Sequence, residues 1–169
     1  MGILIVTVPC GKEKSAKLEI LDCLFPKDHE AYFIEHKYSG ILILESKLSS
    51  DELARLILNC PTAYVHKVIP VDAIVNSNLD SIIEKIKELV KNKKGKIRVD
   101  CRRRGRSIQS SHEVEVVVGR VLKELGYTID LKKPEYLAII NIIDEWTAIS
   151  FGPMERFIDK RAYNGLQKS

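Results

Sequence analysis

Residues 96–151 have the sequence KIRVDCRRRGRSIQSSHEVEVVVGRVLKELGYTIDLKKPEYLAIINIIDEWTAISF, and this stretch decides the fold of the second half of the 169-residue chain. Alternating apolar and charged side chains predict a strand over residues 97–101. Apolar residues at helical spacing predict a helix over 110–125. Two apolar runs, 136–143 and 146–151, predict two strands joined by a tight turn. The stretch therefore predicts a small α/β layer unit.

The predicted helix over 110–125 has signals at both of its ends. Ser110 and Glu113 form an S-x-x-E capping box at its start, and Gly126 follows its last apolar residue. A second amphipathic helix is predicted over 79–90, where polar residues precede an apolar stripe and lysines follow it. The second half of the chain thus has the predicted order αβαββ.

The first half of the chain predicts the order βαββαβ, the ferredoxin-like arrangement with two helices on one face of a four-stranded sheet. The strands are predicted over 3–8, 31–38, 41–45 and 63–70, and the helices over 12–24 and 49–60. We place the domain boundary at the polar residues that follow Val75, so that a ferredoxin-like domain covers 1–75 and a second domain covers 76–169. Residues 152–169 show no strong period, and we expect them to lie over the surface as an arm.

The composition, 45% hydrophobic and 30% charged, is that of a soluble globular protein. The apolar stretch near the start is about half as long as a membrane span of roughly 20 residues, and signal-peptide and lipid-anchor motifs are missing. We therefore expect a cytoplasmic protein without membrane contact. The cysteines Cys10, Cys23, Cys60 and Cys101 lack C-x-x-C spacing, so we predict four reduced, mostly buried thiols.

Basic residues are concentrated in the second half of the chain. Residues 1–92 carry 11 basic and 13 acidic residues, a net charge of −2, whereas residues 93–169 carry 16 and 10, a net charge of +6. Within residues 91–106, nine bases accompany one acid, Asp100. Such a run is the electrostatic footprint of a protein that binds a polyanion.

Motifs that would indicate catalysis do not match. The turn at Gly11 is not a P-loop, because Val6 and Glu13 occupy positions that require Gly and Ser or Thr. His112 would begin a zinc-protease helix only if a second histidine stood at position 116, which is Val116. The histidines also lack the spacing of a zinc site. We therefore predict no catalytic residue, no metal site and no cofactor.

The segment RRRGR, residues 102–106, lies between the predicted strand and the helix that starts at Ser110. Guanidinium groups offer planar forks for phosphate oxygens, and a helix N-terminus adds N–H donors and a partial positive charge. The segment therefore predicts a site for a phosphate backbone. As an alternative, the arginines solvate the surface or pair with Glu113 and Glu115.

In their order along the chain, these motifs resemble the THUMP domain, the RNA-binding module of tRNA-modifying proteins. The family pattern is an R-x-R-G loop, a Ser-led helix that carries Val-Gly, an Asp-Leu-x-x-Pro passage and a two-stranded close. Here these features are residues 102–105, 110–119, 130–134 and 136–151. The resemblance covers residues 79–151.

The resemblance implies that a ferredoxin-like domain ahead of the THUMP domain helps to hold tRNA at its acceptor end. It also implies similarity to the stand-alone THUMP adaptor of tRNA cytidine acetylation, because the sequence ends at residue 169 and residues 6–24 resemble the opening of that group. We therefore expect a non-catalytic protein that presents tRNA to a modifying enzyme, specifically a cytidine acetyltransferase. The predicted RNA-binding residues are Lys94, Lys96, Arg98, Arg102, Arg103, Arg104, Arg106 and Ser110.

Three other functions stay open at this point. The chain could be the RNA-binding subunit of a methylation or thiolation complex, a basic module that binds an acidic protein, or a small enzyme in its own right. The oligomeric state is not predicted.

Overall fold

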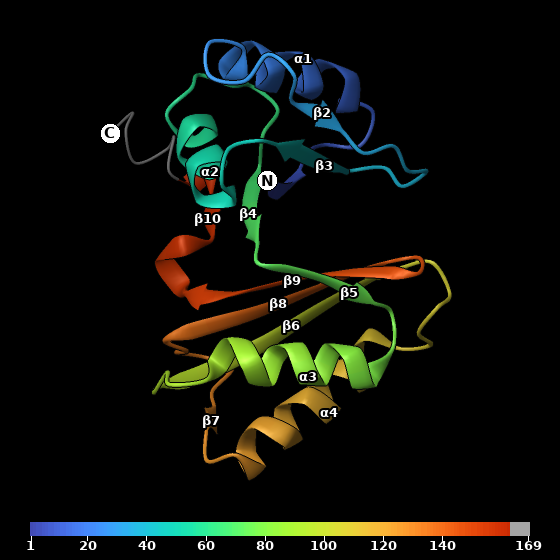
Figure 1. Ribbon diagram of the computed structural model, residues 1–169, viewed down its shortest axis with the longest axis vertical. Helices are drawn as coiled ribbons and strands as arrows, with labels where there is room; N and C mark the ends of the chain where they lie inside the picture. Colours follow the sequence, from blue (N-terminus) through green and yellow to red (C-terminus); the bar gives the residue numbers. More distant parts are fainter. Residues whose placement is uncertain (163–169) are drawn as a thin grey trace. The chain divides into compact units, whose positions relative to one another are not determined.

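The chain forms two β-sheets, each with two helices packed on one face, in the computed structural model, which describes residues 1–162 (Figure 1). The first unit comprises Met1–Val71 together with residues 157–162, and the second comprises Asp72–Arg156. The predicted mixed α/β class is confirmed. Within the described residues, no helix is long and apolar enough to cross a membrane.

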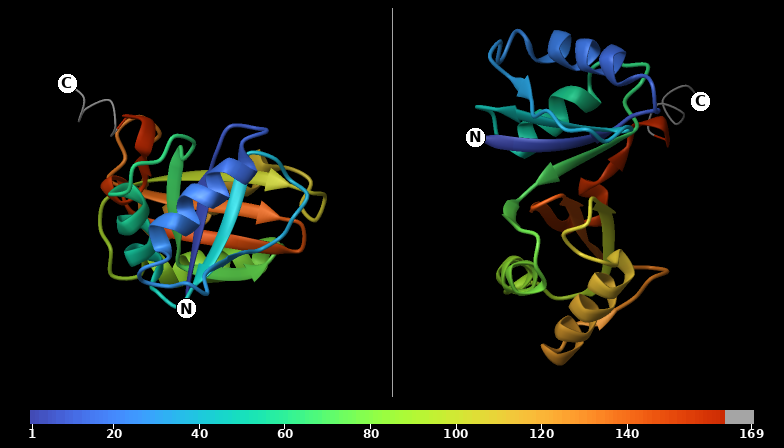
Figure 2. Two further views of the ribbon diagram at one scale, coloured as in Figure 1. Left: turned by 90° about the horizontal axis from the view of Figure 1, so that it is seen from above. Right: turned by 90° about the vertical axis from the view of Figure 1, so that its right-hand side faces the viewer.

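The first unit has a five-stranded antiparallel sheet in the order β10-β4-β1-β3-β2. Its strands are β1 (Gly2–Thr7), β2 (Tyr32–Phe33), β3 (Ile41–Ser46), β4 (Lys67–Val71) and β10 (Ile158–Asp159). Its helices, α1 (Glu13–Leu24) and α2 (Ser50–Leu58), lie on the same side of the sheet (Figure 2). Side chains buried between sheet and helices include Leu4, Leu44, Ile20, Leu53 and Ile57. The order βαββαβ is thus confirmed for residues 2–71.

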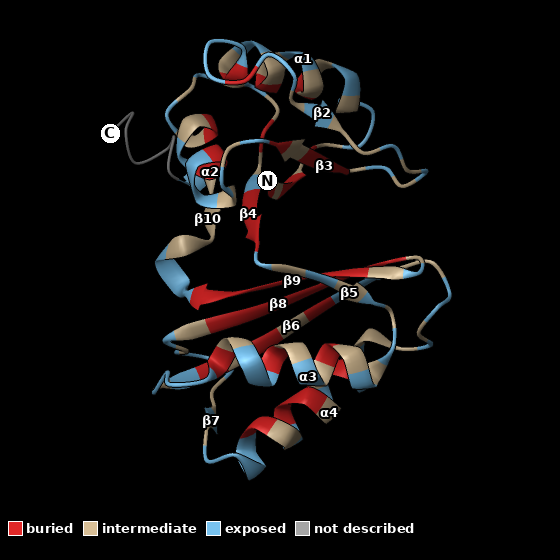
Figure 3. Ribbon diagram, in the orientation of Figure 1, coloured by how far each residue is buried: buried red, intermediate tan, exposed pale blue. Residues whose placement is uncertain are grey.

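The second unit has a five-stranded sheet in the order β5-β9-β8-β6-β7, in which β6 runs parallel to β7 and β8. Its strands are β5 (Ala73–Asn76), β6 (Lys96–Arg104), β7 (Thr128–Ile129), β8 (Tyr136–Ile143) and β9 (Trp146–Pro153). Helices α3 (Leu79–Val90) and α4 (Ser111–Glu124) cover one face of this sheet. Figure 3 shows that β8 and β9 are buried over most of their length. The predicted helices and both strands of the hairpin are confirmed.

Capping explains where three of the helices begin. Ser49 Oγ accepts a hydrogen bond from the N–H of Glu52 at 3.2 Å at the start of α2, and Ser110 Oγ accepts one from Glu113 at 3.2 Å at the start of α4. Asn78 Oδ1 accepts from the N–H of Ser81 at 2.8 Å at the start of α3. Each bond satisfies a donor that has no partner within the helix.

The prediction of a strand over 31–38 was wrong for most of its length, since only Tyr32 and Phe33 form β2. Beyond them, the N–H of Ile34 still donates to the carbonyl of Ile43 at 2.8 Å. The N–H of Tyr38, however, donates to the His36 ring at 3.1 Å. A local side-chain acceptor thus replaces the neighbouring strand.

The structure divides the chain elsewhere than we predicted, after Val71 and again after Arg156. The first difference arises because β5 pairs with β9, which joins residues 73–76 to the second sheet. The second arises because β10 pairs with β4, with Ile158 opposite Val68. The predicted arm is therefore partly a sheet strand, and the rest of it, 163–169, lies outside the described residues.

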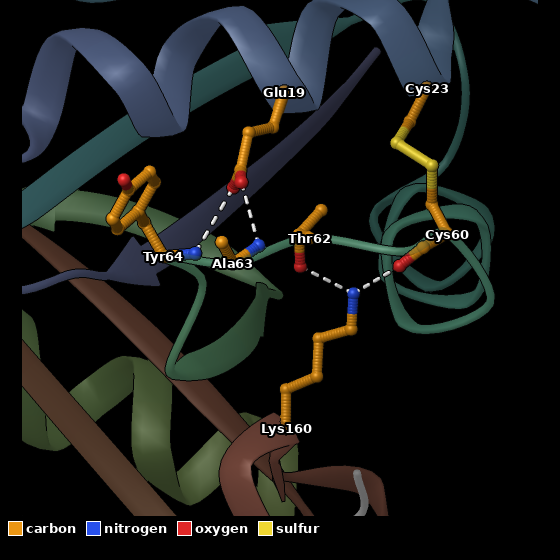
Figure 4. Close-up of a disulfide and its surroundings, with 7 residues drawn as sticks. All are labelled: Glu19, Cys23, Cys60, Thr62, Ala63, Tyr64 and Lys160. Carbon is orange, nitrogen blue, oxygen red and sulfur yellow. Dashed lines mark hydrogen bonds between the residues drawn. A yellow bond between two sulfur atoms is a disulfide. The ribbon is translucent and has the colours of Figure 1, made fainter.

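The prediction of four reduced thiols was wrong for two of them, because a disulfide joins Cys23 of α1 to Cys60, which follows α2 (Figure 4). Their Cα atoms lie 6.1 Å apart, within the usual range for disulfides. Cys10 is a free, exposed thiol, and Cys101 is free and buried. Burial, and then the charge of Glu115, raise the pKa of the Cys101 thiol to about 12.

Two buried or half-buried charged groups hold the segment after α2. Lys160 is fully buried, and its ammonium group donates to the carbonyl of Cys60 and to Thr62 Oγ1 (Figure 4). The Glu19 carboxylate accepts from the N–H groups of Ala63, at 2.6 Å, and Tyr64, at 3.2 Å. Burial lowers the pKa of Lys160, and the charge of Glu19 opposes this effect. The disulfide, Lys160 and Glu19 therefore fix the same stretch of backbone.

Candidate nucleic-acid interface

The first component of the candidate site is the end of β6. We predicted that the strand ends at Cys101 and that residues 102–106 lie between it and the next helix, but β6 continues through Arg104. The reason is its partner, since β6 pairs with β8 without interruption up to Arg104, which lies opposite Ile143. Ladder hydrogen bonds thus hold three of the arginines in an extended backbone, and the loop begins at Gly105, whose φ of +97° favours glycine.

Alternation along β6 separates the core from the charged face, as predicted. Ile97, Val99 and Cys101 are buried against the helices. The intervening residues, Arg98, Asp100, Arg102 and Arg104, belong to the opposite face. Arg98 Nε donates to Asp100 Oδ1 at 2.9 Å, so the charge of Arg98 is partly neutralised.

The arginines at the end of β6 have no carboxylate partner among the described residues. Arg104 donates from NH1 to Asn141 Oδ1 at 3.5 Å, and Arg103 donates to the carbonyl of Ile108 at 3.2 Å. Arg102 and Arg106 are exposed. Burial, and then the charge of Arg102, lower the pKa of Arg104. Like charges are therefore crowded here, and an anion bound between them would relieve their repulsion.

The second component is the N-terminus of α4. The Ser110 hydroxyl serves as the cap, and the loop 105–110 brings this helix end next to the end of β6 (Figure 1). A helix N-terminus carries partial positive charge, which adds to that of the arginines. Five predicted site residues thus lie together, namely Arg102, Arg103, Arg104, Arg106 and Ser110.

Lys94 and Lys96 do not join this group. Lys96 is the first residue of β6, and eight residue steps of about 3.3 Å place it roughly 26 Å from Arg104. Its ammonium lies 3.7 Å from Asp130 Oδ2. The single basic run of the sequence is therefore two clusters at opposite ends of one strand, with Arg98 between them.

Sequence reasoning missed what else meets at this end of the sheet. Pairing places Ile143 opposite both Arg104 and Trp146, and Trp146 opposite Asn76. Helix α3, capped by Asn78, therefore starts at the same end of the sheet as the one where β6 ends (Figure 1). Only the register of the sheet shows this, because these residues are far apart in the sequence.

Nothing in the described part of the chain resembles a metal centre, since no three His, Cys, Asp or Glu side chains converge. The site that the structure does present is at the end of β6, where cationic side chains lie beside the hydrogen-bond donors of a helix N-terminus. Its chemistry is that of anion binding, most simply to phosphate.

In comparisons with known proteins, the second unit matches one protein family. Residues 76–151 match the family model of the THUMP domain. No curated protein matches the chain in sequence.

Several solved structures share the fold. They include PH1313 of Pyrococcus horikoshii Ot3, with a TM-score of 0.68 and 21% identity over 94% of this chain and 55% of that one. TrmN of Thermus thermophilus has a TM-score of 0.62 and 20% identity over 89% of this chain and 45% of that one. A 4-thiouridine synthetase in complex with RNA and ATP has a TM-score of 0.59 and 11% identity over 90% and 41%. The chain thus spans roughly half the length of these proteins or less, and the likeness concerns the fold.

The family match lies within the unit Asp72–Arg156 and contains both the end of β6 and the start of α4. The candidate site is therefore part of the matched region. Residues 76–151, which contain the candidate site, are thus the part of the chain that is similar to a THUMP domain.

Proposed function

We propose that this protein is a non-catalytic, cytoplasmic tRNA-binding protein that holds the acceptor end of tRNA and presents it to a separate modifying enzyme. The observation that carries the proposal is the crowding of Arg102, Arg104 and Arg106 beside the N-terminus of α4, within a THUMP domain. A THUMP domain suggests binding of tRNA in tRNA modification. The solved structure of the 4-thiouridine synthetase, which shares the fold, contains RNA.

In the proposed mechanism, the exposed Arg102 and Arg106 bind phosphate oxygens through their guanidinium forks. The half-buried Arg104 contributes charge from the floor of the site, held by Asn141. The first N–H groups of α4 receive a further phosphate oxygen. Lys94, Lys96 and Arg98 lie toward the start of β6 and contact other phosphates of the tRNA backbone, away from those bound by the arginines.

The enzyme that acts on the presented tRNA is proposed to be a cytidine acetyltransferase, since residues 6–24 resemble the opening of the adaptor of that reaction. A second candidate is a methylation or thiolation complex. It is favoured by the names of proteins with the same fold, which include a possible methylase of Clostridium difficile and the 4-thiouridine synthetase.

The test is titration of labelled tRNA at several salt concentrations with wild type, with Arg102→Ala/Arg104→Ala and with Lys94→Ala/Lys96→Ala. Each lost phosphate contact lowers the slope of log affinity against log salt by about 0.9, so the arginine variant should lose about 0.9 through Arg102 and up to about the same again through the charge of Arg104. The lysine variant should lose less, because Lys96 is paired with Asp130.

Competitors identify what is recognised. An acceptor-end minihelix should compete as well as tRNA, whereas a 3′-trimmed tRNA and a DNA duplex should compete poorly. Equal competition by all of them would reject acceptor-end recognition and favour a basic module for an acidic protein. Turnover of tRNA by the purified chain alone would reject the non-catalytic role.

A further inference from the structure

The outer edge of β6 is open over most of its length. Strand β7 pairs with β6 only at Lys96 and Ile97, whereas β8 pairs with β6 up to Arg104 on the inner side (Figure 1). In the described part of the chain, residues 98–104 of β6 therefore have no neighbouring strand on the outer side. An open edge presents backbone donors and acceptors to any added strand.

Two hydrogen bonds show which backbone groups point outward. The carbonyl of Ile97 accepts from the N–H of Asp130 at 3.1 Å, beside β7. Four residues on, the N–H of Cys101 donates to Glu115 Oε2 of α4 at 3.1 Å. Because outward groups recur every second residue, Val99 and Arg103 present their backbone on the same side. A side-chain carboxylate thus occupies the place where a strand carbonyl would bind.

A groove of about 560 Å³ lies along this edge, between β6 and α4, with β7 and the residue that follows Asp130 at one end. Its apolar wall includes Val116 of α4 and Leu131, whose side chains are 45% and 66% exposed. Ile129 and Gly119 also line it. These apolar side chains lie on the helix side of the sheet edge.

The opposite side of the same edge is cationic. Arg98 and Arg102 lie there, and Asp100, the acid between them, is engaged by Arg98. On the rim of the groove, Arg120 and Lys123 are exposed. Side chains of an added strand alternate between the two sides, so one set would meet apolar residues and the other set would meet arginines.

We propose that the edge of β6 from Val99 to Arg103 binds an extended segment of a partner protein as an added strand, with apolar and acidic residues in alternation. A carbonyl of this segment replaces Glu115 at the N–H of Cys101. A polypeptide is favoured over RNA because only a polypeptide supplies both N–H donors and carbonyl acceptors at the spacing of a strand. This interaction uses the lateral edge of β6 and shares Arg102 and Arg103 with the proposed RNA site, but it does not depend on RNA binding.

The probe is a labelled heptapeptide, Glu-Val-Glu-Val-Glu-Val-Glu with blocked ends, compared with a peptide of equal composition in which the valines are consecutive. Fluorescence anisotropy gives the affinity, and amide chemical shifts locate the site. We expect the alternating peptide to bind at least tenfold more tightly and to shift the amides of Val99, Cys101 and Arg103.

Val116→Asp places a charge in the apolar wall and should weaken binding of the alternating peptide at least tenfold. Leu18→Asp is the matched control, because Leu18 is an exposed apolar residue of helix α1 and lies outside the groove. Both variants should bind tRNA as wild type does, so the two proposals fail separately.

The proposal is wrong if the two peptides bind equally, if Val116→Asp has no effect, or if the shifted amides lie elsewhere. It is also wrong if a single-stranded RNA shifts the amides of Val99, Cys101 and Arg103 while the alternating peptide does not. That outcome would make the groove an extension of the RNA site.

Discussion

The two units of this chain have the same layers, a five-stranded sheet with two helices on one face, but they are held together differently. In the first, the Cys23–Cys60 disulfide connects the end of α1 to the end of α2, and Lys160 hydrogen-bonds to the backbone next to it. The second has no disulfide, and its first and last residues are joined by an ion pair in which Asp72 binds Arg156 at 2.7 Å. One unit is closed by a covalent bond and the other by charge.

The two units also differ in charge, because the candidate RNA site lies in the second unit. The second unit holds the crowded arginines of the candidate RNA site, whose mutual repulsion opposes folding. It must offset this repulsion with its core, its helix caps and the ion pair of Asp72. The described residues of the first unit hold no such cluster, so the stability of this unit can be measured without interference from the proposed ligand.

The largest expected effect is the loss of the disulfide. Closing a loop of 37 residues contributes about 4 kcal/mol in the chain-entropy account, so Cys23→Ser/Cys60→Ser should lower the unfolding free energy of the first unit by up to that amount. Trp146, the only tryptophan, reports on the second unit. In urea, the circular dichroism transition should begin earlier while the fluorescence transition stays in place.

Cys10→Ser is the control, since Cys10 is a free thiol. A reductant should reproduce the effect in wild type. If both transitions of the double variant moved together, the two units would not be independent in stability, and the comparison drawn above would fail.

The disulfide also shows what the sequence could not predict. Helices α2, α3 and α4 were predicted to within one or two residues at their starts, because Ser49, Asn78 and Ser110 act within one turn of the chain. The pairing of Cys23 with Cys60 depends instead on two helices packing on the same face of one sheet. Nothing in the spacing of four cysteines shows that contact.

Short strands were missed for a related reason. Strands β5, β7 and β10 have two to four residues, and each exists because a neighbour pairs with it. The layout of the candidate site also depends on strand pairing, which the sequence alone does not show. Composition predicted a polyanion-binding segment, but only the ladder between β6 and β8 shows that Arg104 belongs to a strand and that Lys96 lies at its far end.

The next effect in size concerns the ion pair of the second unit. Asp72 accepts from both terminal nitrogens of Arg156 and from the N–H of Phe151, with side-chain exposures of 21% for Asp72 and 16% for Arg156. Hydrogen bonds to charged groups contribute about 1.5–3 kcal/mol, so Asp72→Asn should destabilise the second unit by about 2 kcal/mol, as measured by Trp146 fluorescence in urea.

The first unit offers a matched pair, Asp159 with Arg161, which is more exposed. Asp159→Asn should cost less than about 1 kcal/mol. Equal effects of the two substitutions would mean that the Asp72 pair contributes no more than a surface ion pair, and that the second unit depends on its core alone.

The two serine caps should give a smaller effect that is equal in both units. Ser49 and Ser110 accept equivalent bonds of 3.2 Å, so Ser49→Ala and Ser110→Ala should each cost about 1 kcal/mol in urea unfolding, and Thr should restore part of the loss. Only Ser110→Ala should also weaken binding of tRNA. Equal tRNA affinity for both variants would remove the start of α4 from the proposed site.

The smallest effect is expected in the loss of stability at acid pH, and each unit offers an aspartate whose pKa is lowered in the folded state. The Ser46 hydroxyl, and then the N–H groups of Lys47 and Glu30, lower the pKa of Asp28 below 3.8. The N–H groups of Lys133 and Lys132, and then Lys96, lower the pKa of Asp130 in the same way. A lowered carboxyl pKa stabilises the folded state fully above pH 3.8, and this stabilisation is lost as the pH falls through the lower, folded-state value.

Asp28→Asn should therefore flatten the acid dependence of the first unit, read by circular dichroism, and Asp130→Asn that of the second, read by Trp146 fluorescence. Asp22→Asn controls for the loss of one carboxylate. If either substitution flattened both transitions, acid unfolding would be one event for the whole chain, and the separate stability of the two units would be excluded.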